Sequence, residues 1–199
     1  GAATVGYATI AGSGINATIL HYVENESVCR DGDLLLVDAG AEYMSYSGDI
    51  TRTYPVNGKF TAPQRAVYEV VLDAQMKAIA ACRPGAGFSE VHDVALRALV
   101  EGLVKLKVLS GTPDEIIKNE SYKPYYMHRT SHWLGLDVHD VGEYRRGEDW
   151  RKLEPGMVLT VEPGLYFSEW AQDAPAEYKG IGIRIEDDVL ITETGHEVL

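Results

Sequence analysis

The sequence predicts an α+β fold in a single domain of 199 residues. Three observations support this: strand-like segments fill the first sixty residues, two helical segments follow, and strands return from Pro124 onward. Strands followed by helices and then by further strands indicate an α+β domain. Hydrophobic residues make up 45% of the chain and charged residues 24%, which is typical of a globular protein with a sizeable core.

The first strands are marked by apolar or alternating runs that end at turn residues. Residues 34–38 form an apolar run that the Ala-Gly pair at 39–40 stops. Residues 49–54 alternate before Pro55, and the Asn-Gly pair at 57–58 is a turn signal. These patterns predict antiparallel β structure in this part of the chain.

Two helices are predicted next. The first begins at about Thr61, a good N-cap residue, and ends before Pro84. The second has Ser89 as its cap and continues to about Lys107, because apolar residues recur at helical spacing between them. The Ser-Gly-Thr-Pro segment at 110–113 breaks this second helix.

Later strands are predicted at residues 133–139, 158–162, 181–186 and 189–191. Side chains alternate along a strand, so the three isoleucines of 181–186 share one face while Arg184 and Glu186 share the other. Glu162 likewise falls opposite the apolar side chains of its strand. Each of these two strands therefore turns a carboxylate away from an apolar face.

Four carboxylates are the first sign of a functional site: Asp38, Asp49, Glu162 and Glu186. An ionised carboxylate in a buried setting is costly unless a cation or a hydrogen-bond network compensates it. One such residue alone is more often a cap or a turn residue, but four together indicate a shared metal site. Oxygen-rich donors suit manganese, iron, cobalt or magnesium, and this set has enough ligands for two ions.

Four histidines lie near the acid-bearing strands: His21, His128, His132 and His139. Three of them fall within residues 127–140, beside a glycine-containing turn. A single histidine is usually structural or superficial. Three in so short a segment indicate a metal ligand together with acid or base groups.

Charge and composition exclude several classes of partner. The net charge of −12 and the pI near 4.9 make nucleic acid and anionic membrane surfaces poor partners. No apolar run reaches the length of a membrane span. Cys29 and Cys82 do not form a disulfide framework, and we interpret both as reduced, partly buried thiols of a cytoplasmic protein.

Several segments resemble the pita-bread metallopeptidases. Residues 35–40 followed by 47–53 look like the first metal-binding hairpin of that group, and residues 128–140 closely resemble the histidine segment of the bacterial aminopeptidase P (Xaa-Pro aminopeptidase) family. Residues 154–164 and 182–187 complete the set, in the expected order over nearly the whole chain. The resemblance implies a curved antiparallel sheet with helices on its outer face, and an enzyme that releases the N-terminal residue from peptides with proline in second position.

The resemblance also implies a site with two divalent metal ions, with Mn²⁺ as the first choice. Asp38 would hold one ion, His132 and Glu162 the other, and Asp49 and Glu186 would bridge both. Glu162 would also carry a proton to the proline nitrogen. Catalytic or substrate-side roles are implied for His21, His128, His139, Tyr166 and Arg184.

At the level of the whole protein, the resemblance implies that residues 1–199 are the metallopeptidase catalytic domain without its N-terminal helices and without a separate N-terminal domain. It implies a homo-oligomer for the full-length protein. Two alternatives stay open: a prolidase, which cleaves only Xaa-Pro dipeptides, and a catalytically inactive pita-bread binding module. A metal-free, creatinase-like hydrolase should lack the carboxylate set, which is present here in full.

Basic residues depart from the expected pattern at one point. Arg129 follows His128 where the family usually has glycine, which bears on the shape and width of the pocket at that position. Three further arginines, Arg145, Arg146 and Arg151, lie in a loop with three acidic residues. Pairing with those acids at the surface is the prediction for this loop.

Overall fold

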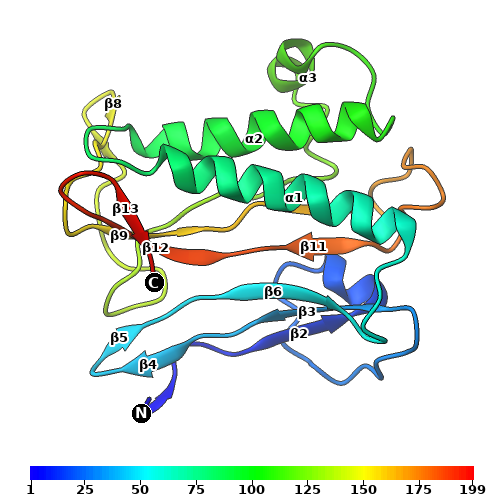
Figure 1. Ribbon diagram of the computed structural model, residues 1–199, viewed down its shortest axis with the longest axis horizontal. Helices are drawn as coiled ribbons and strands as arrows, with labels where there is room; N and C mark the ends of the chain where they lie inside the picture. Colours follow the sequence, from blue (N-terminus) through cyan, green and yellow to red (C-terminus); the bar gives the residue numbers. More distant parts are fainter.

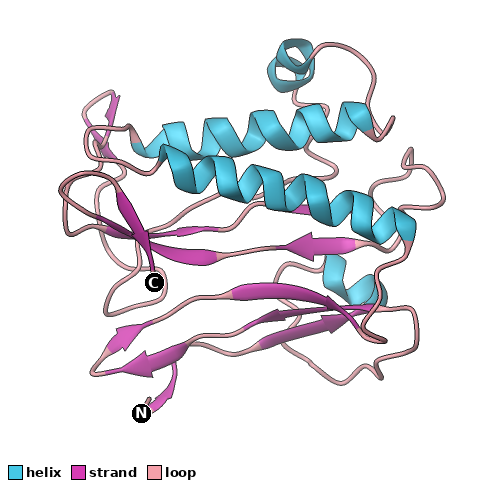
Figure 2. Cartoon of the chain, viewed as in Figure 1, coloured by secondary structure: helices cyan, strands magenta, loops and turns pink.

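The computed structural model describes residues 1–199, and it has two long helices lying over strands (Figure 1). The helices are α1 (Ala62–Ala81), α2 (Phe88–Lys105) and the short α3 (Pro113–Asn119), with a 3-10 helix η1 at Gly14–Thr18. Figure 2 shows the strands as a layer beneath α1 and α2. The predicted α+β class is confirmed, with the two helices on one side of antiparallel strands.

The strands pair only in antiparallel fashion, in small sheets that continue into one another. The central groups are β2-β3-β6 (Ile10–Ser13, Leu34–Asp38, Thr51–Pro55), β13-β12-β9 (His196–Val198, Asp187–Ile191, Val158–Val161) and β10-β11 (Gly164–Tyr166, Gly182–Arg184). Smaller groups are β1-β4-β5 (Thr4–Val5, Ala41–Tyr43, Tyr46–Ser47) and the hairpin β7-β8 (Arg145–Arg146, Asp149–Trp150). The amide of Glu186 donates to the carbonyl of Thr51 over 3.1 Å, which joins the N-terminal strands to the C-terminal ones.

The helix ends follow from capping, with two corrections. Thr61 and Gln64 form a reciprocal capping box at the start of α1, as the sequence predicted for Thr61. The prediction of Ser89 as the cap of α2 is wrong, because the helix begins at Phe88 and Ser89 lies in its first turn. Helix α3 was not predicted, although Thr112 caps it in the same way with Glu115.

The core beneath the helices confirms the alternation predicted for the late strands. Ile181, Ile183 and Ile185 lie in a buried cluster with α1 and α2, and Leu159 and Val161 lie in a second cluster. Arg184 and Glu186, although buried, point away from these clusters and line a cavity.

Close packing of α1 on α2 depends on Gly102. A Cβ atom added at this glycine would lie 2.1 Å from a methyl carbon of Val70, far inside van der Waals contact. The absence of a side chain at position 102 therefore sets how closely the two helices approach each other.

The predicted strand at residues 133–139 is wrong beyond its first residue. Trp133 forms an isolated bridge with Leu159, after which the chain bends back on itself. The amide of Asp140 donates to the carbonyl of Trp133, and the amide of Gly135 donates to the carbonyl of Asp137. These local hydrogen bonds take up the backbone groups that a strand would offer to a neighbour, so the segment is a loop.

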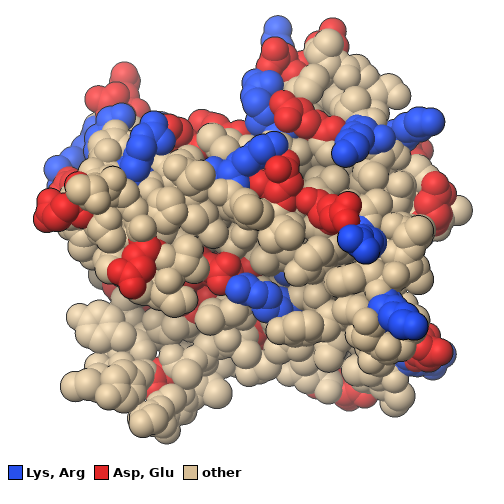
Figure 3. All heavy atoms as spheres, viewed as in Figure 1, with Lys and Arg blue, Asp and Glu red and all other residues tan.

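Surface features complete the fold. The two cysteines differ from the prediction of two partly buried thiols, because Cys29 is exposed while Cys82 is fully buried. Burial raises the pKa of Cys82 to about 12. Figure 3 shows acidic and basic side chains intermingled over the helices on one face of the molecule. None of the helices is both long and apolar enough to cross a bilayer.

Candidate metal centre

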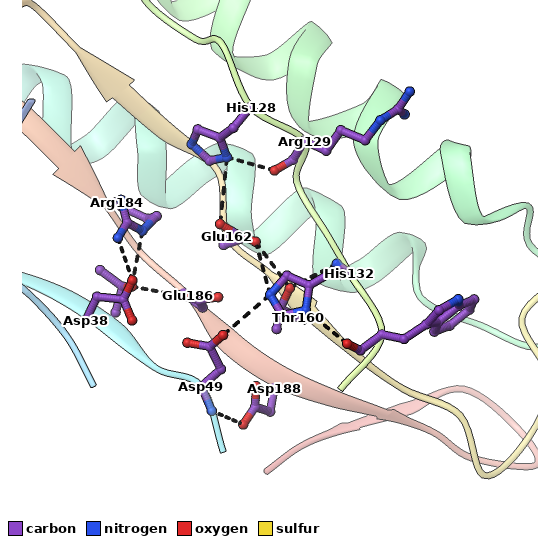
Figure 4. A network of polar contacts seen from close by, with 12 residues as sticks. Asp38, Asp49, His128, Arg129, His132, Thr160, Glu162, Arg184, Glu186 and Asp188 are labelled. Atoms are coloured by element: carbon purple, nitrogen blue, oxygen red, sulfur yellow. Dashed lines mark hydrogen bonds and ion pairs between the residues drawn. The ribbon is translucent and has the colours of Figure 1, made fainter. Parts of the chain in front are cut away.

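A cavity of about 750 Å³ gathers the predicted site residues, which come from strands far apart in the sequence. Nine of the ten predicted residues line it: Asp38, Asp49, His132, Glu162, Glu186, His21, His128, His139 and Arg184. Tyr166, the tenth, is fully buried and lies behind the wall of the cavity, where it contacts His128 and Arg184. Figure 4 shows the acidic side chains facing one another across this space.

Strand ends position the four carboxylates. Asp38 is the last residue of β3, and Asp49 lies two residues before β6, which pairs with β3. Glu162 directly follows β9, and Glu186 lies between β11 and β12. Because the strands that carry them are mostly buried, the four carboxylates have little access to water.

The tightest group of donors consists of Asp49, His132 and Glu186, whose ligand atoms all lie within 4.8 Å of one another. His132 Nδ1 faces the carbonyl oxygen of Trp133 at 3.0 Å, and because a carbonyl only accepts, this nitrogen carries the hydrogen. His132 Nε2 then faces Asp49 Oδ2 at 3.4 Å and Glu162 Oε1 at 3.5 Å (Figure 4). A bare imidazole nitrogen between two carboxylates requires a cation, either a proton or a metal ion.

Tyr7 is a member of the site that the sequence did not reveal. Its hydroxyl lies 2.5 Å from Asp38 Oδ1 and 2.6 Å from Asp49 Oδ1. A phenol has a single hydrogen, so it donates to only one of these oxygens at a time. The second short oxygen–oxygen contact, like the contacts of His132, is favourable only when additional positive charge lies nearby.

The carboxylates compete for that positive charge. Burial raises the pKa of Glu162 to about 7 and raises the pKa of Glu186 well above its usual value, and in both cases neighbouring acids add to the rise. Burial also acts against ionised Asp49, but the contacts with His132 and Tyr7 lower its pKa overall. Acids that cannot all ionise without a cation form a donor set that favours binding of a metal ion.

Arg184 supplies part of the compensation within the protein. Its Nη2 donates to Asp38 Oδ2 over 2.6 Å, its Nη1 to Tyr166 Oη over 3.1 Å and its Nε to Thr51 Oγ1 over 3.2 Å. Burial lowers the pKa of this guanidinium, but the surrounding acidic groups raise it by more than burial lowers it, so Arg184 stays charged. Thr51 links Arg184 to a second carboxylate, because its hydroxyl donates to Glu186 Oε2 over 2.5 Å.

His128 is neutral and its tautomer is fixed. Its Nδ1 lies 2.8 Å from the carbonyl oxygen of Arg129, so Nδ1 carries the hydrogen. Its Nε2 accepts from Tyr166 Oη over 2.8 Å, while that oxygen accepts in turn from Arg184. Burial lowers the pKa of His128 to about 3, and the charge of Arg184 lowers it as well. This chain of contacts holds the ring rigidly at the edge of the cavity.

The two other predicted histidines are more accessible. The ring of His139 stands edge-on to that of His132, with centroids 4.4 Å apart, and its pKa is lowered by burial and by that neighbour. His21 follows η1 and lines the cavity together with Leu20.

Asp188 is a second residue that the sequence did not reveal. Its Oδ2 accepts from the amide of Asp49 over 2.9 Å, and its Oδ1 is buried without a hydrogen-bond partner. Burial raises the pKa of Asp188 to about 7. It therefore fixes the backbone of Asp49 from behind the cavity. The Asp-Asp pair at 187–188 following Glu186 was the available signal.

The donor set fits a divalent cation. Carboxylate oxygens with one imidazole nitrogen suit manganese, iron, cobalt or magnesium. The polar groups behind the ligands, from Tyr7, Thr51 and Asp188, are the kind of outer-shell partners that orient metal ligands.

Comparison with known proteins identifies the family of the chain. A model of the metallopeptidase family M24 matches residues 1–193. The chain is 57% identical over 199 residues to an Xaa-Pro aminopeptidase of Escherichia coli K12, and 54% identical over 193 residues to an Xaa-Pro aminopeptidase of Haemophilus influenzae. These matches cover 100% and 97% of the chain but 45% and 44% of the relatives, so the chain spans less than half of their length.

Solved structures give the same result for the fold. The Pseudomonas aeruginosa aminopeptidase PepP is similar to the chain with a TM-score of 0.97 and 52% identity, and a variant of Escherichia coli aminopeptidase P in complex with substrate is similar with a TM-score of 0.95 and 56% identity. Both matches cover the whole chain and 45% and 44% of those structures. They confirm the predicted pita-bread fold. The chain belongs to metallopeptidase family M24.

Proposed function

We propose that this protein is a metal-dependent aminopeptidase that releases the N-terminal residue from peptides with proline in second position. The observation that carries the proposal is the convergence of four carboxylates and His132 on one cavity. It is supported by the family, which uses divalent metal, and by relatives named Xaa-Pro aminopeptidase.

The metal site of the proposal has two ions, with Mn²⁺ as the first choice. Asp38 would hold one ion, His132 and Glu162 the other, and Asp49 and Glu186 would lie between them. When bound, such ions polarise a scissile carbonyl and acidify an attacking water. The support is the number of oxygen donors on the cavity wall, which exceeds what a single ion requires.

The chain's own residues would position the substrate and move its protons. Glu162 places one oxygen 3.5 Å from His132 Nε2 and the other 3.7 Å from His128 Nδ1, so its carboxylate lies between these two histidines. From there it could pass a proton from water to the proline nitrogen. His139, at the accessible side of His132, would donate to the developing oxyanion.

His128 and His21 would shape the proline side of the pocket. The neutral ring of His128, held by Tyr166 and Arg184, offers a rigid and uncharged wall to the proline ring. This fits an apolar ring better than a charged side chain, because burying an unpaired charge against it would be costly.

The test is turnover of three peptides by the full-length protein, stripped of metal and then supplied with Mn²⁺. We expect Mn²⁺ to restore release of alanine from Ala-Pro-Ala, with little cleavage of Ala-Ala-Ala. Cleavage of Ala-Pro without cleavage of Ala-Pro-Ala would identify a prolidase instead. No cleavage of any peptide by a folded, metal-loaded protein would favour the inactive binding module.

Paired variants test the individual roles. Glu186→Ala should lose metal and turnover together, because it removes a donor that both ions share. His139→Ala should keep its metal content and lower kcat. Loss of metal from His139→Ala with full metal content in Glu186→Ala would reverse these assignments. The separate N-terminal domain, the homo-oligomer and the cytoplasmic location stay predictions.

A further inference from the structure

The cavity has a second, basic end that the metal site does not use. Arg129, Arg145 and Trp150, here called the arginine–tryptophan rim, line the same cavity as the acidic ligands. Phe88 and Tyr144 lie on the wall with them and pack on each other, with ring centroids 4.9 Å apart. Figure 4 shows the Arg129 side chain extending away from the carboxylates while its backbone stays beside His128.

The fold holds the rim in place from two directions. Arg145 and Trp150 are directly opposed partners in the antiparallel hairpin β7-β8, so their side chains share a face. Arg129 is tied to the substrate side because its carbonyl accepts from the ring of His128. The guanidinium carbons of Arg145 and Arg129 lie 4.1 Å and 5.2 Å from the ring centroid of Trp150.

The charges of the rim are not neutralised by neighbouring acids. The sequence predicted surface ion pairs between the arginines and the three acids of this loop, Glu143, Glu148 and Asp149, and Arg146 does pair with Glu143, at 3.4 Å. Arg151 pairs instead with Glu154, which is not one of those acids, at 3.7 Å. For Arg145 the prediction is wrong, because it lies over Trp150 and has no carboxylate within 4.0 Å.

Arg129 has no carboxylate within 4.0 Å either. Asp93 is the acid on α2 whose charge it affects: burial raises the pKa of Asp93 and Arg129 opposes the rise, without an ion pair. In a chain with a net charge of −12, two guanidinium groups facing one cavity without partners require an explanation.

An anionic group of the substrate would supply the missing partner. Under the proposed function, the N-terminal amine and the scissile bond lie at the acidic end, so the C-terminal side of the peptide extends toward the rim. A cavity of about 750 Å³ is within the range of about 300–1,000 Å³ that encloses small ligands, and so suits a peptide of a few residues. A guanidinium binds a carboxylate through two parallel hydrogen bonds, and an aromatic ring beside it limits the orientations that the arginine samples.

We propose that the arginine–tryptophan rim binds the free C-terminal carboxylate of short peptides, so that the enzyme prefers oligopeptides of three or four residues to longer chains. The proposal rests on the proposed function, because the metal end defines which way the substrate lies. It also gives a role to Arg129, the residue that departs from the glycine usual in the family.

The test compares free acids with C-terminal amides in the full-length, Mn²⁺-loaded protein. We expect kcat/KM for Ala-Pro-Ala or Ala-Pro-Ala-Ala to exceed that of the matching amide by about tenfold, as one charge-assisted hydrogen-bonded pair provides. In Arg129→Ala/Arg145→Ala the ratio of kcat/KM for the acid to kcat/KM for the amide should fall to about one. Arg146→Ala is the matched control: it removes the adjacent arginine, which pairs with Glu143, and should keep the preference.

A binding measurement separates failure of this inference from failure of the proposed function. Trp150 reports occupancy of the rim through its fluorescence, and Trp150→Phe shows how much of the signal is its own. We expect the product dipeptide Pro-Ala to change this fluorescence at concentrations about tenfold below those needed for Pro-Ala amide. Equal rates and equal binding for acids and amides at both lengths would overturn the inference and leave the aminopeptidase intact. Binding of the acid without turnover of any peptide would overturn the proposed function alone.

Discussion

Replacing Tyr7 by phenylalanine should weaken the metal site while leaving the fold in place. The ring is retained, and only the hydroxyl beside Asp38 Oδ1 and Asp49 Oδ1 is lost. Because the phenol has one hydrogen, the change removes one charge-assisted hydrogen bond, which contributes about 1.5–3 kcal/mol. At about 1.4 kcal/mol for each tenfold change, the affinity for a divalent ion should fall by roughly 10- to 100-fold, which is also the usual effect of losing an outer-shell partner.

Calorimetric titration of the metal-free protein with Mn²⁺ measures this effect. Tyr43→Phe is the matched control, because Tyr43 is exposed at 58% and makes no side-chain hydrogen bond. Circular dichroism should show the same fold in both variants and in the parent protein. An unchanged affinity in Tyr7→Phe would refute the reasoning that the hydroxyl organises Asp38 and Asp49 as ligands.

Three further predictions concern stability. Burial lowers the pKa of His92 to about 4, so the free energy of unfolding should be retained above the unfolded pKa of about 6.5 and fall by about 3 kcal/mol between pH 6.5 and 4. Urea titrations at several pH values should show a smaller fall in the free energy of unfolding for His92→Gln, and equal falls would contradict this. Gly102→Ala should lower the free energy of unfolding by about 1–2 kcal/mol, because the added methyl group pushes α1 away from α2. The additional substitution Val70→Ala should recover part of the loss of Tm, and a higher Tm for Gly102→Ala alone would show that this contact does not limit the approach of the helices. Arg184→Met should destabilise the metal-free protein by about 3–5 kcal/mol, since it leaves a buried carboxylate unpaired, and urea unfolding near that of the parent would show that the ion pair is not needed.

The parts of the fold that were predictable are those governed by local pattern. Period-two alternation places Arg184 and Glu186 on one face and the isoleucines on the other, because burial of one face is enough to fix a strand's orientation. The capping box at the start of α1 is also a local pattern, because its partners Thr61 and Gln64 lie three residues apart. The prediction of a strand at residues 133–139 failed because apolar composition alone does not reveal the hydrogen bonds that turn the chain back on itself.

The site was predictable as a set of residue types, and its supporting contacts were not. Carboxylates late in apolar runs are costly to bury, which made them visible in the sequence. Tyr7 lies 31 and 42 positions from the two carboxylates that it contacts, and Thr51 lies 135 positions from Glu186. Neither residue is unusual where it stands, so only the tertiary arrangement shows what they do. The pairing of Arg146 and the lack of a partner for Arg145 likewise depend on the hairpin register.

Anomalous diffraction at the manganese edge, from crystals of the protein grown with Mn²⁺, tests the two-metal site most directly. We expect two peaks inside the cavity, with Asp49 and Glu186 between them, Asp38 on one ion, and His132 and Glu162 on the other. Peaks bound by other residues, a single ion at full occupancy, or no peak in the cavity at saturating Mn²⁺ would contradict it.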